Sequence, residues 1–260
     1  MSDLFKVEGL RTVVTGAASG LGLAMAEVMA ERGARVTLAD LDSDGLEAVA
    51  ARLGGDVRTA RVDVSDSAAV ERLFDEVVDE QGGVDVAFAN AGISLEPGVV
   101  DERGGLENLD RGAWDTVLGV NLNGVLFTMR EAARHMKKQG SGRIVVTAST
   151  AGIGTDPMVG YSYSATKAAV LILVRQAALE LAKHGVHVNA IAPGPFRTNI
   201  GGDAAPIPPE AWNDIVAIGR MAEPDELKGV ALLLASPASS FMTGAVVPVD
   251  GGQLLMSHGV

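Results

Sequence analysis

Cysteine is missing from the whole chain of 260 residues, so disulfide bonds and thiolate metal sites are excluded. Long apolar runs are missing too, and no window approaches the roughly 18 to 20 apolar residues of a helix that spans a bilayer. The first ten residues carry no basic segment followed by an apolar one, so no secretory signal is visible. We therefore expect a soluble globular protein whose default location is the cytoplasm.

Basic residues and metal ligands are also scarce. The chain has 21 lysines and arginines against 33 aspartates and glutamates, which gives a formal net charge of -12. A protein that binds nucleic acid needs a basic face, and the basic residues here are scattered among acids, so we expect no nucleic-acid partner. The histidines lack metal-ligand spacing, and we predict no catalytic metal. They are His135, His184, His187 and His258.

What the sequence does contain is a regular alternation of two patterns. Apolar, β-branched runs predict strands at Arg11–Thr15, Arg35–Asp40, 57–63, 84–90, 143–149, 187–193 and 246–251. Segments with helical periodicity lie at 21–32, Ser43–Leu53, Ser67–Gln81, 111–139, 161–183 and 224–235. This alternation implies right-handed crossovers and a parallel sheet of about seven strands. We predict an α/β fold, a single doubly wound domain over residues 1–260 with helices on both faces of the sheet.

Two irregular stretches, residues 93–110 and 198–219, interrupt this alternation. Both follow the carboxyl ends of predicted strands. In open α/β sheets, ligands bind beyond those ends, and loops there often carry the binding residues. We therefore expect both stretches to cover a small-molecule substrate.

A glycine-rich loop, TGAASGLG, joins the first predicted strand to the first helix. Its residues Gly16, Gly20 and Gly22 permit positive φ angles and a close approach of the backbone to a ligand. The helix that follows offers N–H groups and the positive end of its dipole to a pyrophosphate. The same glycines would also suit a tight turn that binds nothing.

Three motifs follow one another along the chain. They are Thr15-Gly16-x-x-x-Gly20-x-Gly22, then Asn90-Ala91-Gly92 after the fourth strand, then Tyr163-x-x-x-Lys167. In this order and spacing they resemble the short-chain dehydrogenase/reductase family, and the resemblance continues to Pro193-Gly194 and to residues 250–252. It implies a Rossmann-type domain that transfers a hydride between NAD(H) and a secondary alcohol or ketone. Two alternatives remain: a dinucleotide-sensing or scaffolding protein without turnover, and an epimerase or dehydratase, which usually needs a larger C-terminal region.

Asp40 ends the second predicted strand, about 20 residues beyond the glycine loop, where a carboxylate can accept hydrogen bonds from the ribose hydroxyls of adenosine. The same negative charge would repel a 2′-phosphate. No arginine or lysine occupies the neighbouring positions Ala17, Ala18 and Leu41. We therefore predict NAD in preference to NADP. The alternative is that Asp40 only caps the turn that follows it.

The resemblance assigns further residues to the cofactor. Around the pyrophosphate, adenine and ribose it places Ser19, Leu21, Asp63, Val64, Asn90, Ala91 and Gly92. At the nicotinamide it places Pro193, Gly194, Phe196 and Thr198. Asp63 is equally consistent with an ordinary turn residue, and Arg197 either meets an anionic substrate or faces water.

Tyr163 and Lys167 are four residues apart, so on a helix their side chains share a face and can both reach a bound ribose and the substrate. The other tyrosine, Tyr161, is six residues from Lys167 and out of phase with it. A neighbouring ammonium favours the phenolate, so we expect Lys167 to lower the pKa of Tyr163. Tyr163 then acts as the base in alcohol oxidation or the acid in ketone reduction, and Tyr161 contacts substrate or packs.

Two further catalytic assignments rest on the resemblance, and each has a competitor. Family members orient the substrate oxygen with a serine three residues before a glycine, which selects Ser149. Thr150 would fit the expected spacing to Tyr163 better, but neighbouring strand residues face opposite sides, and we choose Ser149. For the asparagine that holds a water between the lysine and solvent, we choose Asn121 over Asn123.

The segment 161–183 is apolar around most of its circumference, and residues 170–174 form an unbroken hydrophobic run. A helix that packs only on a sheet should keep one polar face. In the family such helices pair across subunits, commonly in tetramers, so we predict a homotetramer. The alternative is a helix buried entirely within its own chain.

Overall fold

A parallel sheet of seven strands forms the centre of the molecule in the residues that the computed structural model describes, 4–200 and 214–256. The strands lie in the order β3-β2-β1-β4-β5-β6-β7. They are β1 (Arg11–Thr15), β2 (Arg35–Asp40), β3 (Val57–Arg61), β4 (Val86–Ala89), β5 (Gly142–Thr147), β6 (Val186–Pro193) and β7 (Val246–Val249). The chain runs outward from β1 to β3 and returns to β4 beside β1, so the switch point of the doubly wound sheet lies between β1 and β4.

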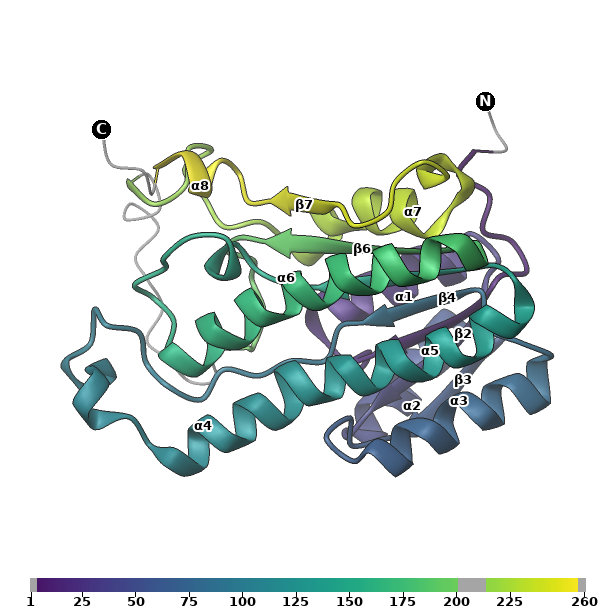
Figure 1. The fold of residues 1–260 in the computed structure, drawn as a ribbon, viewed down its shortest axis with the longest axis horizontal. Coiled ribbons are helices and arrows are strands. Elements are labelled where there is room, and N and C mark those ends of the chain that lie inside the picture. Colours follow the sequence, from purple (N-terminus) through teal and green to yellow (C-terminus); the bar gives the residue numbers. More distant parts are fainter. Residues whose placement is uncertain (1–3, 201–213, 257–260) are drawn as a thin grey trace.

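Helices cover both faces of this sheet (Figure 1). One buried apolar cluster joins the sheet to α1 (Gly20–Glu31), α2 (Ser43–Leu53) and α7 (Lys228–Ala235). A second cluster joins it to α3 (Ser67–Gln81), α5 (Val125–Gln139) and α6 (Tyr161–Leu181). Two further helices are α4 (Arg111–Leu118), which leads toward α5, and α8 (Gln253–Met256), which follows β7. The predicted doubly wound α/β fold is confirmed.

The helix ends follow from local side-chain chemistry. The carboxylate of Asp42 accepts a hydrogen bond from the Gly45 amide (3.0 Å) and starts α2, and Asp66 does the same for α3 through the Ala68 amide (2.9 Å). Both helices span the predicted residues. Across the described residues we find no helix with the length and hydrophobicity to cross a bilayer.

The segment 111–139 departs from the single α-helix predicted for it. A π-helical turn, η3 (Gly119–Gly124), separates α4 from α5. Gly124 ends this turn, and a Cβ there would lie 2.7 Å from Cγ2 of Val64, so only glycine lets the helix approach the segment after β3 so closely. Such turns often mark functional sites, and this one contains Asn121.

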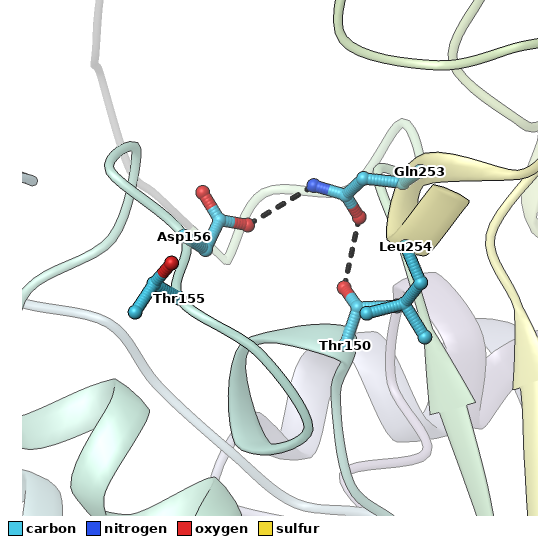
Figure 2. Close-up of a pocket in the computed structure, with 5 residues that line it drawn as sticks. All are labelled: Thr150, Thr155, Asp156, Gln253 and Leu254. Atoms are coloured by element: carbon cyan, nitrogen blue, oxygen red, sulfur yellow. Dashed lines mark hydrogen bonds between the residues drawn. The ribbon is translucent and has the colours of Figure 1, made fainter. Parts of the chain in front are cut away.

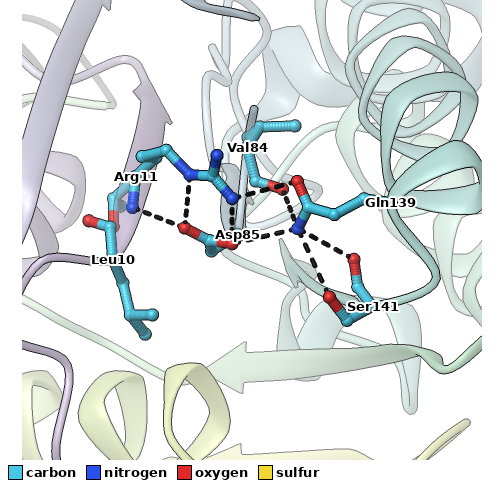
Figure 3. A network of polar contacts seen from close by, with 7 residues as sticks. Leu10, Arg11, Val84, Asp85, Gln139 and Ser141 are labelled. Carbon is cyan, nitrogen blue, oxygen red and sulfur yellow. Dashed lines mark hydrogen bonds and ion pairs between the residues drawn. The ribbon is translucent and has the colours of Figure 1, made fainter. Parts of the chain in front are cut away.

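A polar network closes the sheet at the amino ends of its strands (Figure 3). The Arg11 guanidinium donates to both carboxylate oxygens of Asp85, from Nε and Nη2, at 2.7 Å each. The amide of Gln139, at the end of α5, bridges the pair by accepting from Arg11 (3.0 Å) and donating to Asp85 (3.0 Å). This end is tied together by side chains, so the loops for a ligand lie at the opposite, carboxyl end.

The segment predicted to cover a substrate at 93–110 is anchored to a second loop, residues 153–160. Pro97 and Val159 form an isolated antiparallel bridge, and the Val100 amide donates to the Pro157 carbonyl (3.2 Å). Two short 3₁₀ turns, Glu102–Gly104 and Leu106–Asn108, follow within the segment. Of the other predicted covering stretch, 198–219, residues 201–213 lie outside the described residues.

Candidate active site

The glycine loop lies directly beyond β1 and fits a pyrophosphate. Gly16 and Gly20 have φ angles of 69° and 56°, which favour glycine, and a Cβ at Gly22 would lie 2.0 Å from the Gly16 carbonyl oxygen. At the start of α1, Ser19 makes no side-chain cap, and the first turn, which begins with Gly20 and Leu21, holds no acid. The helix therefore presents its N–H groups and positive dipole end to an anion without competition from its own side chains.

Asp40 lies beside this loop at the end of β2. Its carboxylate accepts hydrogen bonds from the amides of Ala18 (3.0 Å) and Asp42 (3.2 Å). Asp42 caps α2, and the bond from the Asp42 amide shows that Asp40 also caps the turn that follows β2. Arg61 is the Cα partner of Asp40 in the β2–β3 register and is exposed, a nearby cation that the sequence pattern did not single out.

Asn90 connects three strands at the switch point. Its Nδ2 donates to the Thr15 carbonyl (3.0 Å), its Oδ1 accepts from the Thr147 hydroxyl (2.9 Å), and its backbone amide donates to the Thr15 hydroxyl (3.0 Å). An asparagine that ends an apolar strand needs such partners, and Asn90 has them. Gly16 packs close to Ala91, because a Cβ at Gly16 would lie 2.9 Å from the Ala91 Cα. The Asn-Ala-Gly segment thus forms one wall beside the glycine loop.

The ends of β3 and β6 complete the surroundings of the loop. Asp63 is exposed, and its Oδ1 accepts hydrogen bonds from the amide (2.9 Å) and the hydroxyl (2.7 Å) of Ser65, so Asp63 does act as a turn residue. The neighbouring Val64 is buried against Gly124. Beyond β6, a Cβ at Gly20 would lie 3.4 Å from Cγ2 of Thr198, so the segment after β6 reaches the glycine loop.

That segment is shaped by two backbone contacts. Gly194 donates its amide to the Val249 carbonyl (3.0 Å) directly after Pro193, which ends β6. The Phe196 side chain is buried, and the bridge between Phe196 and Ala222 uses the Pro195 carbonyl and the Arg197 amide. The amide of Phe196 itself is not part of that bridge.

Ser149, Tyr163 and Lys167 converge at the carboxyl end of β5. The Ser149 hydroxyl lies near enough to the Tyr163 phenol to lower its pKa. Lys167 is 1% exposed, lies with its Nζ 5.5 Å from the centroid of the Tyr163 ring, and donates to the Thr147 carbonyl (2.8 Å). The helical register predicted for the pair is therefore present. A hydroxyl, a phenol and an ammonium gathered at one strand end can position and protonate a substrate oxygen.

Comparisons with known proteins agree with this geometry. Residues 16–253 match a family model described as enoyl-(acyl carrier protein) reductase. The chain is 42% identical to the cis-4-hydroxycyclohexanecarboxylate dehydrogenase of Sinomonas cyclohexanicum, over 92% of this chain and 94% of that protein. It is 38% identical to the meso-2,3-butanediol dehydrogenase of Serratia marcescens, over 92% of each.

Solved structures lead to the same family. A short-chain type dehydrogenase/reductase from Mycobacterium marinum has a TM-score of 0.89 at 37% identity, covering 97% of this chain and 98% of that one. The chain belongs to the short-chain dehydrogenase/reductase family. It is therefore an oxidoreductase that transfers a hydride with a nicotinamide dinucleotide. A 3-ketoacyl-(acyl-carrier-protein) reductase from Brucella melitensis, solved with NADH, also has a similar structure, with a TM-score of 0.86 at 31% identity over 95% of this chain and 99% of that one.

The electrostatics of the short-chain dehydrogenase site differ from the sequence-based expectation. Burial raises the pKa of the Tyr163 phenol, a hydrogen bond from Ser149 lowers it, and the charge of Asp156 raises it again, with a raised pKa as the result. The expectation that Lys167 makes the pKa of Tyr163 fall is thus wrong. Burial also lowers the pKa of Lys167 itself to about 8, so the ammonium is a weakened partner for a phenolate.

The choice of Ser149 over Thr150 agrees with the directions of their side chains. The Thr150 hydroxyl donates to Oε1 of Gln253 (2.8 Å) and to the Pro193 carbonyl (3.3 Å), away from Tyr163. Gly152 lets this turn pack on α6, because a Cβ there would lie 2.6 Å from the Lys167 carbonyl carbon.

Asn121 is the asparagine that points into the site, whereas Asn123 is exposed. The Asn121 side chain accepts a hydrogen bond from the Ile93 amide (2.8 Å) and donates one to the Ile93 carbonyl (2.8 Å). A Cβ at Gly92 would lie 3.4 Å from Oδ1 of Asn121 and 3.5 Å from Nζ of Lys167, so these groups surround one point. Asn121 therefore also fixes the start of the 93–110 segment, a contact that the sequence pattern did not indicate.

Tyr161, Arg197 and the histidines among the described residues, which the sequence also raised, do not join the group around Tyr163 and Lys167. Tyr161 is 40% exposed at the start of α6, and Arg197 forms an exposed ion pair with Glu223 (2.8 Å). In the part of the chain that the structure describes, no three or more histidine, aspartate or glutamate side chains are grouped to hold a metal ion. His258 lies outside the described residues.

Proposed function

We propose that this short-chain dehydrogenase is NAD-dependent and interconverts a secondary alcohol and its ketone, with a neutral hydroxylated compound such as a diol, a polyol or a cyclic alcohol as substrate. The convergence of Ser149, Tyr163 and Lys167 next to the glycine loop carries the proposal. The relative named for butanediol supports a neutral diol, and the relative named for hydroxycyclohexanecarboxylate supports only the cyclic secondary alcohol, because that compound carries a carboxylate. Both relatives are named as dehydrogenases, so they do not favour the alternatives of a silent dinucleotide-binding protein or an epimerase.

In this proposal each residue has a defined part. When bound, the nicotinamide group accepts or supplies the hydride. Tyr163 takes the proton from the alcohol or returns it to the ketone oxygen, and Ser149 donates a hydrogen bond that orients this oxygen. Lys167 holds the ribose, and Asn121 holds a water that links Lys167 to solvent.

The cofactor would be held along the carboxyl edge of the sheet. The glycine loop with Ser19 and Leu21 binds the pyrophosphate, and Asp40 binds the adenosine ribose. The other cofactor residues of the proposal are Asp63, Val64, Asn90, Ala91, Gly92, Pro193, Gly194, Phe196 and Thr198. In this proposal segments 93–110 and 198–219 cover the substrate. The cofactor and the substrate are both bound by one dinucleotide-binding domain.

The proposed function is tested with a panel of secondary alcohols and ketones, each measured with NAD(H) and NADP(H) through the absorbance of the reduced nicotinamide. We expect turnover of neutral diols or polyols, with NAD preferred. Absence of turnover for the whole panel, together with tight NADH binding, would support the silent-binder alternative instead.

Replacing Asp40 with serine should change the cofactor preference. The serine keeps an acceptor for the Ala18 amide but removes the charge that repels a 2′-phosphate, and Arg61 lies beside it in the sheet. We expect the ratio of kcat/KM with NADP to kcat/KM with NAD to rise by about 100-fold. Asp79→Asn, an exposed change on α3, is the control. A wild-type enzyme that uses NADP as well as NAD would contradict the role of Asp40.

We also propose that the enzyme is a cytoplasmic homotetramer. Within the run 170–174, Val170, Leu171 and Val174 are buried by the chain itself, so the run is covered more fully than its sequence suggested. Ile172 and Leu179 on the same helix remain 60% and 78% exposed, and burying them would favour a second subunit. Light scattering coupled to size-exclusion chromatography should give four times the chain mass at micromolar concentration. A monomer would contradict the proposal, and Ile172→Asp should dissociate the assembly.

A further inference from the structure

Two threonines near the end of β5 hold different parts of the molecule. The Thr150 hydroxyl donates to Oε1 of Gln253 (2.8 Å), as Figure 2 shows, and ties the turn after β5 to the C-terminal segment. Thr147, the last residue of β5, is buried, and its hydroxyl and its carbonyl both bind residues of the candidate site. The hydroxyl donates to Oδ1 of Asn90 (2.9 Å), and the carbonyl accepts from Nζ of Lys167 (2.8 Å). The sequence motifs assign no part to Thr147.

The direction of the hydrogen bond between Thr147 and Asn90 is fixed by the other partners of the asparagine. Nδ2 of Asn90 donates to the carbonyls of Thr15 (3.0 Å) and Gly16 (3.3 Å), and a carbonyl oxygen can only accept. Oδ1 must therefore face Thr147, where it needs a donor. A threonine or serine hydroxyl supplies this hydrogen, whereas valine has nearly the same shape as threonine and cannot donate.

The carbonyl of Thr147 holds the ammonium of Lys167. The last residue pair of the β4–β5 ladder is Ala89 with Val146, so Thr147 lies one residue past this ladder. Lys167 is buried, and among the described residues only the Thr147 carbonyl accepts a hydrogen bond from its Nζ. An ammonium has three hydrogens, so two remain for other partners. Thr147 thus connects the lysine, through Asn90, to the backbone of the glycine loop.

We propose that Thr147 is a positioning residue for hydride transfer, which sets the separation between the glycine loop and Lys167 through its two hydrogen bonds. This inference rests on the proposed function, in which the loop binds the pyrophosphate and Lys167 binds the ribose beside the nicotinamide. Without the Thr147 hydroxyl, Oδ1 of Asn90 loses its donor, and an acceptor in that position turns away or takes a water instead. The end of β5, and with it Lys167, is then no longer tied to the loop.

Thr147→Val tests this role, because it removes the hydroxyl and keeps the shape. We expect NADH to bind about 10-fold more weakly, and kcat for the best alcohol of the panel to fall about 10-fold. ADP has the pyrophosphate but lacks the nicotinamide ribose, and it should bind as it does to wild type, because Asn90 still donates to Thr15 and Gly16. Thr147→Ser restores the donor and should bring NADH affinity and kcat within about threefold of wild type.

Thr37→Val is the matched control for a loss of stability alone. Thr37 is buried within β2, and its hydroxyl accepts from Nε2 of Gln81 (3.1 Å), so the variant also leaves a buried amide without its partner. Urea unfolding should show a loss of stability, while NADH affinity and kcat stay within about twofold of wild type. If Thr147→Val does not fold, Thr147→Ala takes its place. The smaller side chain leaves room for a water at Oδ1 of Asn90, which satisfies the acceptor but does not tie it to β5.

The outcomes separate this inference from the proposed function. NADH affinity and kcat within about twofold of wild type in the folded variant, or ADP weakened as much as NADH, would overturn the positioning role. Turnover by the wild type leaves the proposed function intact in either case. If the wild type binds NADH but oxidises no alcohol of the panel, the proposed function fails, and the affinities for NADH and ADP still test Thr147.

Discussion

Replacing Tyr163 with phenylalanine should lower kcat on the order of 10³-fold and leave cofactor affinity nearly unchanged. The substitution removes one hydroxyl, the group whose pKa Ser149 lowers, and keeps the ring that packs near Lys167. A proton-transfer group acts mainly in the transition state, so its loss should appear in kcat and kcat/KM together. Affinity is measured by titration of NADH fluorescence, and turnover by NADH absorbance.

Tyr161→Phe is the matched control for this experiment. Tyr161 lies two residues earlier, is 40% exposed, and has no place in the contacts around Ser149 and Lys167. We expect its kcat to stay within about threefold of wild type. An inactive Tyr161→Phe beside an active Tyr163→Phe would mean that the helical register assigned to catalysis is wrong.

The raised pKa of Tyr163 also gives the direction of the pH dependence. Alcohol oxidation needs the deprotonated phenol, so kcat/KM for oxidation should rise with pH and keep rising toward and beyond pH 10. Ketone reduction needs the protonated phenol and should stay level across neutral pH. The two directions measured on one substrate pair across pH 6 to about 10.5 would reveal the difference.

Lys167→Met should reduce kcat/KM by about 100-fold or more and change the pH dependence of stability. The pKa of the buried ammonium is about 8 in the folded protein, against 10.5 for an ordinary lysine. The unfolded state therefore binds more protons between these values, and the free energy of unfolding rises with pH across this window. The contribution is on the order of 3 kcal/mol, and methionine, which cannot titrate, removes it.

Urea unfolding gives the free energy of unfolding of wild type and of Lys167→Met at pH 7.5 and at about pH 10.5. The effect is the change with pH in wild type minus the change with pH in the variant. Wild type should gain stability relative to Lys167→Met as the pH rises. Lys183→Met, which replaces an exposed lysine just beyond α6, should behave like wild type. If Lys167→Met and wild type show the same pH dependence, Lys167 is more hydrated than its 1% exposure implies.

The sequence predicted those parts of the site whose geometry is local. Tyr163 and Lys167 share a face because helical periodicity places residues four apart together. The glycine loop and Asp40 lie at strand ends, where a parallel sheet gathers its ligand-binding groups. The alternation of strand and helix patterns predicted the order of the elements. It did not predict the π-helical turn at Asn121, because helical periodicity over 111–139 does not reveal a single wider turn.

The parts that could not be predicted are those made by distant segments. Gln253 is 103 residues from Thr150 and 97 from Asp156, both of which it contacts. Glu96 accepts a hydrogen bond from the Ser162 amide (3.3 Å), and these two residues are 66 apart. No periodicity connects such positions. The pKa of Tyr163 escaped prediction for a related reason, because spacing places Lys167 nearby but does not say how deeply the phenol itself is buried, and this burial raises its pKa.

The bridge between Pro97 and Val159 has a consequence for engineering substrate range. Together with Glu96, which binds both the amide and the hydroxyl of Ser162, it couples the 93–110 segment to the start of α6, one residue from Tyr163. Exchanging 93–110 alone for the segment of a relative would disturb the catalytic helix along with the specificity loop. The transferable module is the pair, 93–110 with 153–160, taken from one donor.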